Sequence, residues 1–308
     1  MTNFDISVSF DNTPYLDSEI YLFFDTLEHN IPDDTTVHIT SNRDAKDKVM
    51  KWIGTKDINF KWYYKEDINL VSRCRYLMHS LEIETDKDWI IKMDLDTLIL
   101  KNLSEFDLYL NDAFMRGYDI AIQPENRRIV PDDRLEFKLW RILYRAMDID
   151  LPRERIRFIE DKDYGLPLFS TGTFAIQSHH IDKINKRWVD LTRKCENWIG
   201  YNIHPNEFAF TAMVYDYGWR WKELEEKFNY NPIGHYRDGE YPITELKDYC
   251  PLPRDIVLLH YHKPQWLMHL AKRNPHIMEI IGKTSNNVPK SWWNLDNSVF
   301  KEKTYGNL

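Results

Sequence analysis

Short apolar segments alternate with segments of helical periodicity along the first third of the chain. Four segments have the pattern of strands: residues 5–10, 36–40, 58–63 and 89–93. Three segments between them carry apolar residues at helical spacing: residues 15–27, 44–53 and 69–83. This alternation predicts βαβ units and an α/β fold with a mostly parallel sheet. Ligands bind beyond the carboxyl ends of the strands in such sheets, so the residues that follow each strand are the first candidates for a functional site.

The pattern is less regular in the rest of the chain. Strands are predicted at residues 170–177 and 256–260, and helices at residues 132–147, 179–195, 205–217 and 266–281. No internal repeat, low-complexity segment or linker divides the chain. We therefore expect a single domain over residues 1–282 with inserts, followed by a polar tail over residues 283–308. Residues 126–160 are a candidate insertion that covers the cleft, although a solvated amphipathic helix fits this segment as well.

Composition excludes several classes of protein. The 308 residues carry a net charge of −8, which argues against nucleic acid as a partner because such binders need a basic surface. The 10 glycines form no G-x-G-x-x-G, and neither G-x-S-x-G nor H-E-x-x-H occurs, so dinucleotide, hydrolase and zincin sites are disfavoured. The three cysteines include no C-x-x-C pair. Free thiols, no signal-peptide pattern and no apolar run of membrane length together predict a cytoplasmic protein.

Two carboxylates follow the apolar strand that is predicted at residues 89–93. Asp94 and Asp96 come directly after residues 89–93, and side chains at positions i and i+2 of an extended segment point the same way. Two such charges repel unless a cation lies between them. Carboxylate oxygens suit magnesium or manganese, which then bridge to phosphate. The other interpretation is a pair of solvated turn carboxylates.

The segment from Asp94 to Phe106 resembles the D-x-D block of the GT-A nucleotide-sugar glycosyltransferases. It is most similar to glycosyltransferase family 8, which includes glycogenin and bacterial lipooligosaccharide galactosyltransferases. The resemblance implies a Rossmann-like GT-A fold with a mixed, mostly parallel sheet flanked by helices. It also implies a manganese or magnesium ion and a nucleotide-sugar donor, with a UDP-sugar favoured. Five further segments resemble that family in the same order along the chain.

Two of these segments concern the nucleotide. Asp11 and Asn12 with Tyr15 resemble the family's base-binding D-x-N-Y turn, although two extra residues precede the tyrosine. Arg75 matches the arginine of the family's Y-x-R-L-x helix start, which implies contact with the diphosphate or with the acidic pair. Leu95, between the two aspartates, is assigned to the nucleotide site as well. A capping turn and a surface ion pair are the alternatives for the first and second segments.

Two segments concern the sugar. Residues 169–174 resemble the family's F-N-x-G strand, but Ser170 replaces the sugar-contacting asparagine, which leaves the donor sugar open. Asn206 and Glu207 occupy the place of the family's catalytic D-Q pair. Glu207 is a candidate general base, nucleophile or ion-pair stabiliser. A first-turn glutamate favoured by the helix dipole is the alternative. The resemblance favours retention at the anomeric carbon, and Glu207 in place of glutamine leaves inversion open.

The last matching segment lies near the C-terminus. His260 to Trp266 resembles the family's H-x-x-G-x-x-K-P-W block, although the spacing is shorter and the glycine is absent. The resemblance implies that His260 is the third protein ligand of the metal and that Lys263 contacts the diphosphate. His262 is an alternative ligand, and a purely structural role for His260 is the other interpretation.

These features predict a metal-dependent enzyme of glycan biosynthesis that moves a sugar from a nucleotide-diphosphate-sugar to a hydroxyl of a glycan, glycolipid or protein. The alternatives are a carbohydrate-binding protein without catalysis and a sugar-phosphate nucleotidyltransferase. The tail, with Trp292 and Trp293 and four lysines, is a candidate for peripheral membrane contact or for packing on the domain. Four aromatic residues are candidates for stacking on sugar rings or for the core: Trp198, Tyr201, Trp219 and Trp221.

Overall fold

The structure is a computed structural model that describes most of the chain. The described residues are 2–10, 17–43, 49–50, 53–65, 79–124, 136–157, 164–199, 205–231, 252–261 and 264–283. The predicted tail therefore lies outside them, except for its first residue. The predicted helices at residues 44–53 and 69–83 lie largely outside them too. Residues 80–83, at the end of the second of these, are a turn and an extended segment, so the helix prediction is wrong there.

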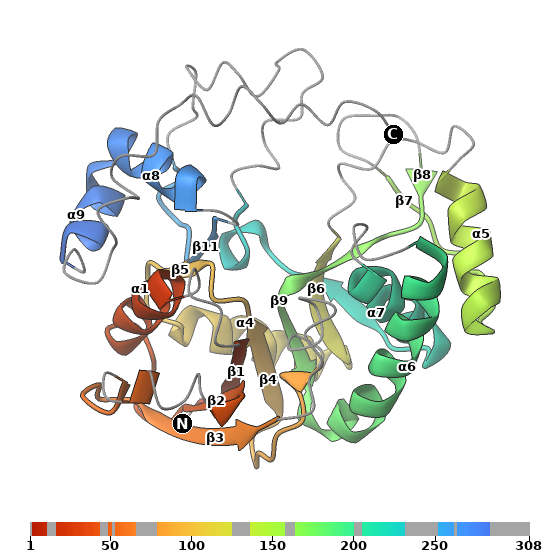
Figure 1. Ribbon diagram of the computed structural model, residues 1–308, viewed down its shortest axis with the longest axis horizontal. Coiled ribbons are helices and arrows are strands. Elements are labelled where there is room, and N and C mark those ends of the chain that lie inside the picture. The colour runs from red at the N-terminus through yellow and green to blue at the C-terminus, as the bar shows by residue number, and fades with distance from the viewer. Residues whose placement is uncertain are drawn as a thin grey trace.

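A mixed sheet of seven strands forms the centre of the molecule (Figure 1). In spatial order its strands are β10 (Trp221–Glu223), β6 (Ile120–Pro124), β9 (Phe169–Gln177), β4 (Trp89–Met93), β1 (Phe4–Phe10), β2 (Thr36–Ser41) and β3 (Asn59–Tyr64). β9 runs antiparallel to both of its neighbours, and the other pairs are parallel. The predicted mostly parallel sheet is confirmed. β1, β4 and β9 are buried along their whole length, as apolar central strands should be.

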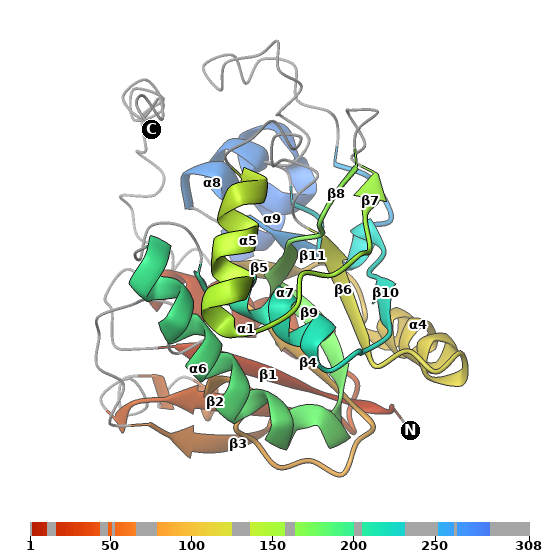
Figure 2. The ribbon, with the colours of Figure 1, turned by 90° about the vertical axis from the view of Figure 1, so that its right-hand side faces the viewer.

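Helices cover both faces of the sheet. α5 (Glu136–Met147), α6 (Ile181–Ile199) and α7 (Pro205–Asp216) lie on one face (Figure 2). α1 (Asp17–Glu28) and α4 (Ser104–Met115) pack on the other. A hydrophobic core lies on each face of the sheet, and successive side chains of β4 point to opposite faces. Trp89 and Ile91 therefore pack in the core with α1, and Ile90 packs in the core with α6 and α7. None of the helices in the described ranges is both long and apolar enough to cross a membrane.

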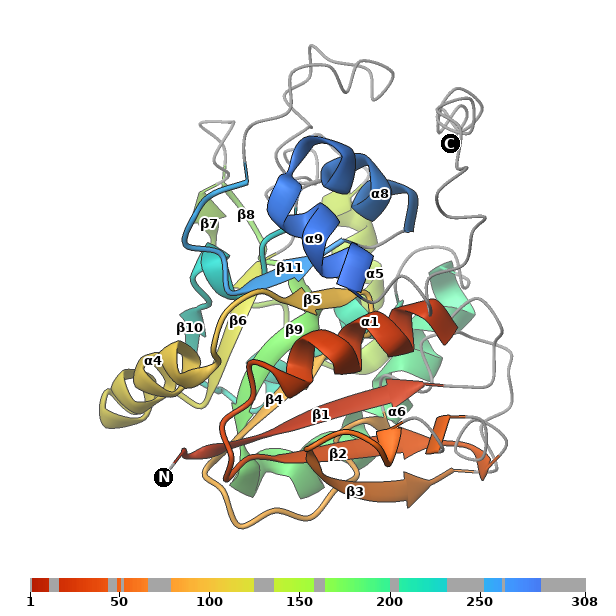
Figure 3. The ribbon, with the colours of Figure 1, turned by 90° about the vertical axis from the view of Figure 1, so that its left-hand side faces the viewer.

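A third cluster lies beside α1 (Figure 3). It contains the small antiparallel pair of β5 (Thr97–Ile99) and β11 (Leu258–His260), with α8 (Pro264–Arg273) and α9 (Pro275–Lys283). The single helix predicted for residues 266–281 is wrong, because the chain breaks at Asn274. Pro275 begins the second helix, and the side-chain oxygen of Asn274 accepts hydrogen bonds from the N–H groups of His276 and Ile277 at 3.0 and 3.3 Å.

The remaining elements are short. They are the pair β7 (Ile156–Arg157) and β8 (Tyr164–Gly165) and the 3-10 turns η3 (Ser178–His180) and η4 (Glu226–Phe228). Six elements have no counterpart in the sequence prediction: α4, β6, β7, β8, β10 and η4.

Candidate active site

The acidic pair lies where β4 ends, at the carboxyl edge of the parallel strands. Asp94 is the first residue after β4, and Asp96 directly precedes β5. The N–H of Asp94 donates to the carbonyl of Gly172 at 2.8 Å, which ties the turn to β9. The sheet therefore presents both carboxylates at the edge where ligands bind in such folds.

β11 brings His260 to this edge from more than 160 residues away in the sequence. In the antiparallel pair, His260 lies opposite Thr97, and the N–H of Tyr261 donates to the carbonyl of Asp96 at 2.9 Å. The His260 ring is buried, and its Nε2 lies 3.2 Å from Oδ1 of Asp96. Ligand atoms of His260, Asp94 and Asp96 all lie within 4.8 Å of one another. The three residues predicted to bind a metal are thus brought together.

Asn229 fixes which nitrogen of His260 faces the acidic pair. Its amide nitrogen donates to Oε1 of Gln123 at 3.1 Å, so its oxygen faces Nδ1 of His260, 3.2 Å away, and accepts the proton there. Nε2 then directs its lone pair toward Asp96. Two acceptors at this distance repel each other unless Nε2 is protonated or both bind one cation. Two carboxylates with an imidazole are a donor set that fits a divalent ion.

Gly172 is required by the packing of this histidine. A Cβ atom at residue 172 would lie only 2.2 Å from Cε1 of His260. Any larger residue would push the imidazole away from Asp96. The glycine of the F-N-x-G resemblance therefore has a direct structural reason in this chain, namely the close approach of the ring to β9.

Lys92 contacts the acidic pair from inside the sheet, and the sequence reasoning missed it. Its side chain is fully buried, and Nζ donates to the carboxylate of Asp94 and to the carbonyl of Thr171, the latter at 2.5 Å. A charged residue within the apolar segment W-I-I-K-M was the available signal. Burial raises the pKa of the Asp94 carboxyl; the Lys92 charge opposes that shift and the Asp96 charge adds to it.

A third carboxyl group, Glu19 of α1, lies near the pair and was also missed. Glu19 is buried, and burial together with the charges of Asp96 and Asp94 raises its pKa to about 8. The hydroxyl of Tyr261 is buried as well, with no hydrogen-bond partner in the described part of the chain. Burial and the charges of Glu19 and Asp96 raise the pKa of that tyrosine. Two buried groups that keep their protons at neutral pH therefore lie beside the acidic pair.

The start of α7 joins the site through β9. Asn206 and Glu207 are both buried in the first turn of the helix. The amide nitrogen of Asn206 donates to Oγ1 of Thr171 at 2.9 Å, and the indole of Trp188 donates to the carbonyl of Asn206 at 2.9 Å. The side-chain oxygen of Asn206 is buried and receives no hydrogen bond within the described ranges. The described residues therefore leave this acceptor without a donor.

Several predicted residues are placed elsewhere or not described. Five of the predicted nucleotide-site residues lie outside the described residues: Asp11, Asn12, Tyr15, Arg75 and Lys263, as do His262 and Tyr201. The side chain of Leu95 is buried in the core with α1 and β4, which leaves its main chain for any contact with a nucleotide. Ser170 is buried.

The aromatic candidates differ in exposure. Trp219 packs in the core against His180 at the other end of the sheet, which favours the core interpretation for that residue. Trp221 is half-buried and donates to Glu154 at 3.1 Å, and Trp198 is exposed.

Two other features of the described chain lie away from this site. Asp119, His179 and His180 cluster at the amino end of the strands, where Nε2 of His180 lies 2.9 Å from Asp119 and Nδ1 has no partner in the described residues. A histidine that binds a metal through Nε2 almost always donates its Nδ1–H to an acceptor, and the described residues offer none here. The geometry therefore favours a structural His–Asp hydrogen bond.

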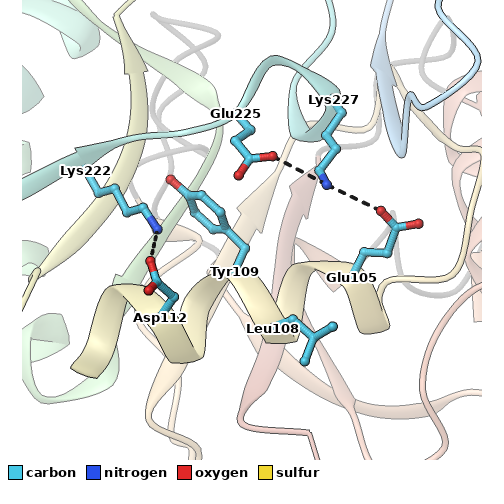
Figure 4. A pocket seen from close by; sticks show the side chains of 7 residues that line it. All are labelled: Glu105, Leu108, Tyr109, Asp112, Lys222, Glu225 and Lys227. Carbon is cyan, nitrogen blue, oxygen red and sulfur yellow. Dashed lines mark hydrogen bonds and ion pairs between the residues drawn. The ribbon is translucent and has the colours of Figure 1, made fainter. Parts of the chain in front are cut away.

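A surface hollow of about 350 Å³ lies between α4 and the segment 222–227 (Figure 4). Its two lysines pair with acidic neighbours: Lys222 with Asp112 at 2.8 Å, and Lys227 with Glu105 and Glu225 at 3.5 and 3.4 Å. Both lysines are thus paired within the hollow, and it shares no residue with the candidate active site.

Comparison with known proteins supports the fold. Neither a family model nor a curated protein matches the sequence of this chain. Among solved structures, the galactosyltransferase LgtC in complex with donor and acceptor sugar analogues matches with 15% identity and a TM-score of 0.56, over 94% of this chain and 99% of LgtC. Mouse xyloside xylosyltransferase 1 matches with 13% identity and a TM-score of 0.52, over 84% of this chain and 97% of its own.

A third match is GlyE of Streptococcus pneumoniae TIGR4, with 11% identity and a TM-score of 0.53, over 96% of this chain and 62% of GlyE. At these identities the likeness establishes the fold. The chain has the GT-A fold of glycosyltransferases, as the D-x-D resemblance predicted.

Proposed function

We propose that this protein is a glycosyltransferase that moves a sugar from a nucleotide-diphosphate-sugar, most favourably a UDP-sugar, to a hydroxyl of a glycan, glycolipid or protein. The observation that carries the proposal is the convergence of Asp94, Asp96 and His260 within 4.8 Å at the carboxyl edge of a GT-A sheet. LgtC, which has the same fold, has been solved with donor and acceptor sugar analogues.

The acidic pair and His260 would hold a manganese or magnesium ion. Such an ion, when bound, supplies positive charge to the diphosphate as it leaves the sugar. The carboxylates of Asp94 and Asp96 offer oxygen ligands, and Asn229 keeps the Nε2 lone pair of His260 available. Gly172 allows the His260 ring to reach this position.

We assign recognition of the nucleotide to the residues that resemble the nucleotide-binding segments of glycosyltransferase family 8. We assign Asp11, Asn12 and Tyr15 to the base, on which the tyrosine ring can stack while the polar side chains pair with its edge. Arg75 and Lys263 would add positive charge at the diphosphate, and Leu95 would contact the nucleotide through its main chain.

The reacting carbon would lie near the start of α7. Asn206 offers a buried carbonyl oxygen without a donor in the described chain, suited to a sugar hydroxyl. Glu207, in the first turn of the same helix, is the candidate nucleophile, general base or stabiliser of positive charge at the anomeric carbon. Retention remains the favoured outcome, and analysis of the anomeric configuration of the product distinguishes it from inversion.

Donor hydrolysis tests the proposal. A panel that includes UDP-galactose, UDP-glucose and UDP-xylose is incubated with the protein in the presence of Mn²⁺ or of a chelator. We expect release of UDP from at least one donor, loss of that release with the chelator, and a loss of at least about 100-fold in Asp96→Ala. Asp119→Ala is the matched control, because it removes an aspartate at the opposite end of the sheet, and it should retain activity.

Other outcomes point to the alternatives. Pyrophosphate release from a nucleoside triphosphate and a sugar phosphate would favour a nucleotidyltransferase. Glycan binding without turnover, unchanged in Asp96→Ala, would favour a carbohydrate-binding protein. Peripheral membrane contact through residues 283–308 is a separate proposal, and liposome co-sedimentation of the full chain, compared with a chain truncated at Lys283, tests it.

A further inference from the structure

Lys92 is anchored to the acidic pair from within the sheet. Its side chain is completely buried in β4, on the same side of the strand as Asp94 two residues later. Nζ donates to the Asp94 carboxylate and to the Thr171 carbonyl at 2.5 Å. A buried ammonium group is costly unless it is paired and hydrogen-bonded, and here both partners belong to the edge where the site lies.

This contact fixes Asp94 from two directions. The N–H of Asp94 is held by the Gly172 carbonyl at 2.8 Å, and one carboxylate oxygen is held by Lys92. The Asp94 side chain remains 20% exposed, so it is accessible to a ligand on its other face. Its position is therefore preorganised, while part of its charge is already balanced by the protein.

The charge of Lys92 distinguishes two forms of a divalent cation. The carboxylates of Asp94 and Asp96 carry two negative charges, and the adjacent ammonium removes one of them. A bare divalent cation is repelled by that ammonium. A divalent cation that is bound to a nucleoside diphosphate belongs to a complex that is negative as a whole, and the same ammonium attracts it.

We propose that Lys92 is a positioning residue that holds Asp94 and makes the acidic pair take up a divalent cation together with a nucleoside diphosphate in preference to the bare cation. The inference rests on the proposed function, because it requires the donor's diphosphate to bind beside Asp94 and Asp96. It adds to that function a coupling between the two ligands: the cation binds more tightly when the diphosphate is present.

Mn²⁺ binding to the full chain tests the inference independently of turnover. Electron paramagnetic resonance detects free Mn²⁺ during titration of the protein, without UDP and with UDP, and a protein-free UDP titration supplies the correction for Mn²⁺ bound to the nucleotide. For the wild type we expect Mn²⁺ to bind at least about tenfold more tightly when UDP is present.

Two variants separate the charge of Lys92 from its packing. Lys92→Met keeps most of the length of the side chain. In this variant the affinity for bare Mn²⁺ should be at least about fivefold higher than in the wild type. The increase in Mn²⁺ affinity that UDP causes should fall below about threefold. Lys92→Arg keeps the charge and should behave like the wild type. Lys222→Met is the matched control, because Lys222 pairs with Asp112 away from the site, and both of its Mn²⁺ affinities should equal those of the wild type.

The outcomes distinguish this inference from the proposed function. If the wild type binds Mn²⁺ equally well with and without UDP, the inference is wrong while the metal site stands. A folded Lys92→Met protein whose affinity for bare Mn²⁺ is unchanged or weaker also overturns it. If no Mn²⁺ binds even with UDP, the proposed function itself fails. If circular dichroism shows that Lys92→Met does not fold, the inference is tested with two other measurements. These are the ratio of the wild-type Mn²⁺ affinities with and without UDP, and the same ratio for Lys92→Arg.

Discussion

Asn229 is the residue that selects the nitrogen of His260 facing the acidic pair, so its removal should weaken metal binding without touching a ligand. In Asn229→Ala the imidazole loses the acceptor at Nδ1, 3.2 Å away, and both tautomers become accessible. Loss of such a supporting contact typically lowers metal affinity by about 10- to 100-fold. We expect this drop for Mn²⁺ in the presence of UDP, measured by electron paramagnetic resonance.

The control for this prediction is Asn185→Ala. Asn185 of α6 also donates from its side-chain amide, to the carbonyl of Leu81 at 3.0 Å, but it lies outside the site. Its Mn²⁺ affinity should match that of the wild type. An Asn229→Ala protein with wild-type affinity would show that His260 does not depend on this contact, and it would weaken the assignment of His260 as a ligand.

A side chain at residue 172 should displace the ring of His260. In Gly172→Ala the new methyl group would lie 2.2 Å from Cε1 of His260, so the ring must move away from Asp96. We expect a loss of about 1–3 kcal/mol in the free energy of unfolding in urea, typical of overpacking, together with weaker Mn²⁺ binding. Gly282→Ala is the matched control, because no atom lies within 4 Å of its new Cβ. It should be neutral or slightly stabilising within a helix.

The raised pKa of Glu19 should make the free energy of unfolding depend on pH. Its pKa is 4.5 in the unfolded chain and about 8 in the folded protein. Between these values the folded state keeps a proton that the unfolded state releases. The stability that Glu19 contributes is therefore complete below pH 4.5 and decreases as the pH rises to 8. Glu19→Gln removes this penalty.

The measurement is urea unfolding of the metal-free protein between pH 5 and 8. Relative to the wild type, Glu19→Gln should gain roughly 2–4 kcal/mol over this range. Glu28→Gln, on the same helix but partly exposed and paired with Lys56, is the comparison variant and should show no such gain. Parallel pH profiles for the wild type and Glu19→Gln would mean that Glu19 is ionised in the folded protein.

At the scale of elements, Asn274 decides where one helix ends and the next begins. Its side-chain oxygen accepts hydrogen bonds from the N–H groups of His276 and Ile277 at the start of α9. Asn274→Ala should cost about 1 kcal/mol of unfolding free energy, whereas Asn274→Ser keeps a capping oxygen and should cost much less. Urea unfolding of both variants is the measurement. Equal stabilities for the two variants would show that the break depends on Pro275 alone.

The same scale shows which elements the sequence could predict. The alternation of apolar strands and helices was sufficient for β1, β2, β3 and β4, because each is short, apolar and bounded by polar turns. α4 escaped prediction because Leu108 and Met115 are 72% and 84% exposed, and apolar residues on its outer face obscure the helical period. β10 has only three residues, none of them buried, so it has no apolar pattern to detect.

Only the parts of the site that are close in sequence, or that the family resemblance includes, could be predicted. Asp94 and Asp96 share a face because they are two residues apart, and the resemblance added His260. The contact of Lys92 with Thr171 was not predictable, because Thr171 reaches it only when β9 lies antiparallel beside β4. Asn229 and Gln123 likewise meet His260 through pairings between distant segments. Such contacts depend on the register of the sheet, which local patterns do not contain.

At the scale of the whole molecule, the site joins four segments that are distant in sequence. The acidic pair follows β4, Gly172 lies on β9, Asn206 is the second residue of α7 and His260 ends β11. A ligand at their junction contacts elements from both faces of the sheet, so it should stabilise the folded chain as a whole. Binding at 100 times the dissociation constant adds about 2.7 kcal/mol of stability. For a chain of this size we expect a rise of roughly 5 °C in the melting temperature.

The last prediction combines this effect with the acidic balance of the chain. Mn²⁺ with UDP should raise the melting temperature by that amount, Mn²⁺ alone should raise it much less, and Asp96→Asn should abolish the rise. A single-stranded oligonucleotide with Mn²⁺ offers more phosphate groups but meets a chain of net charge −8, so it should cause no shift beyond that of Mn²⁺ alone. Differential scanning calorimetry measures all four conditions. Equal shifts with the oligonucleotide and with UDP would mean that phosphate charge alone is recognised, and would contradict a nucleotide site built at Asp94 and Asp96.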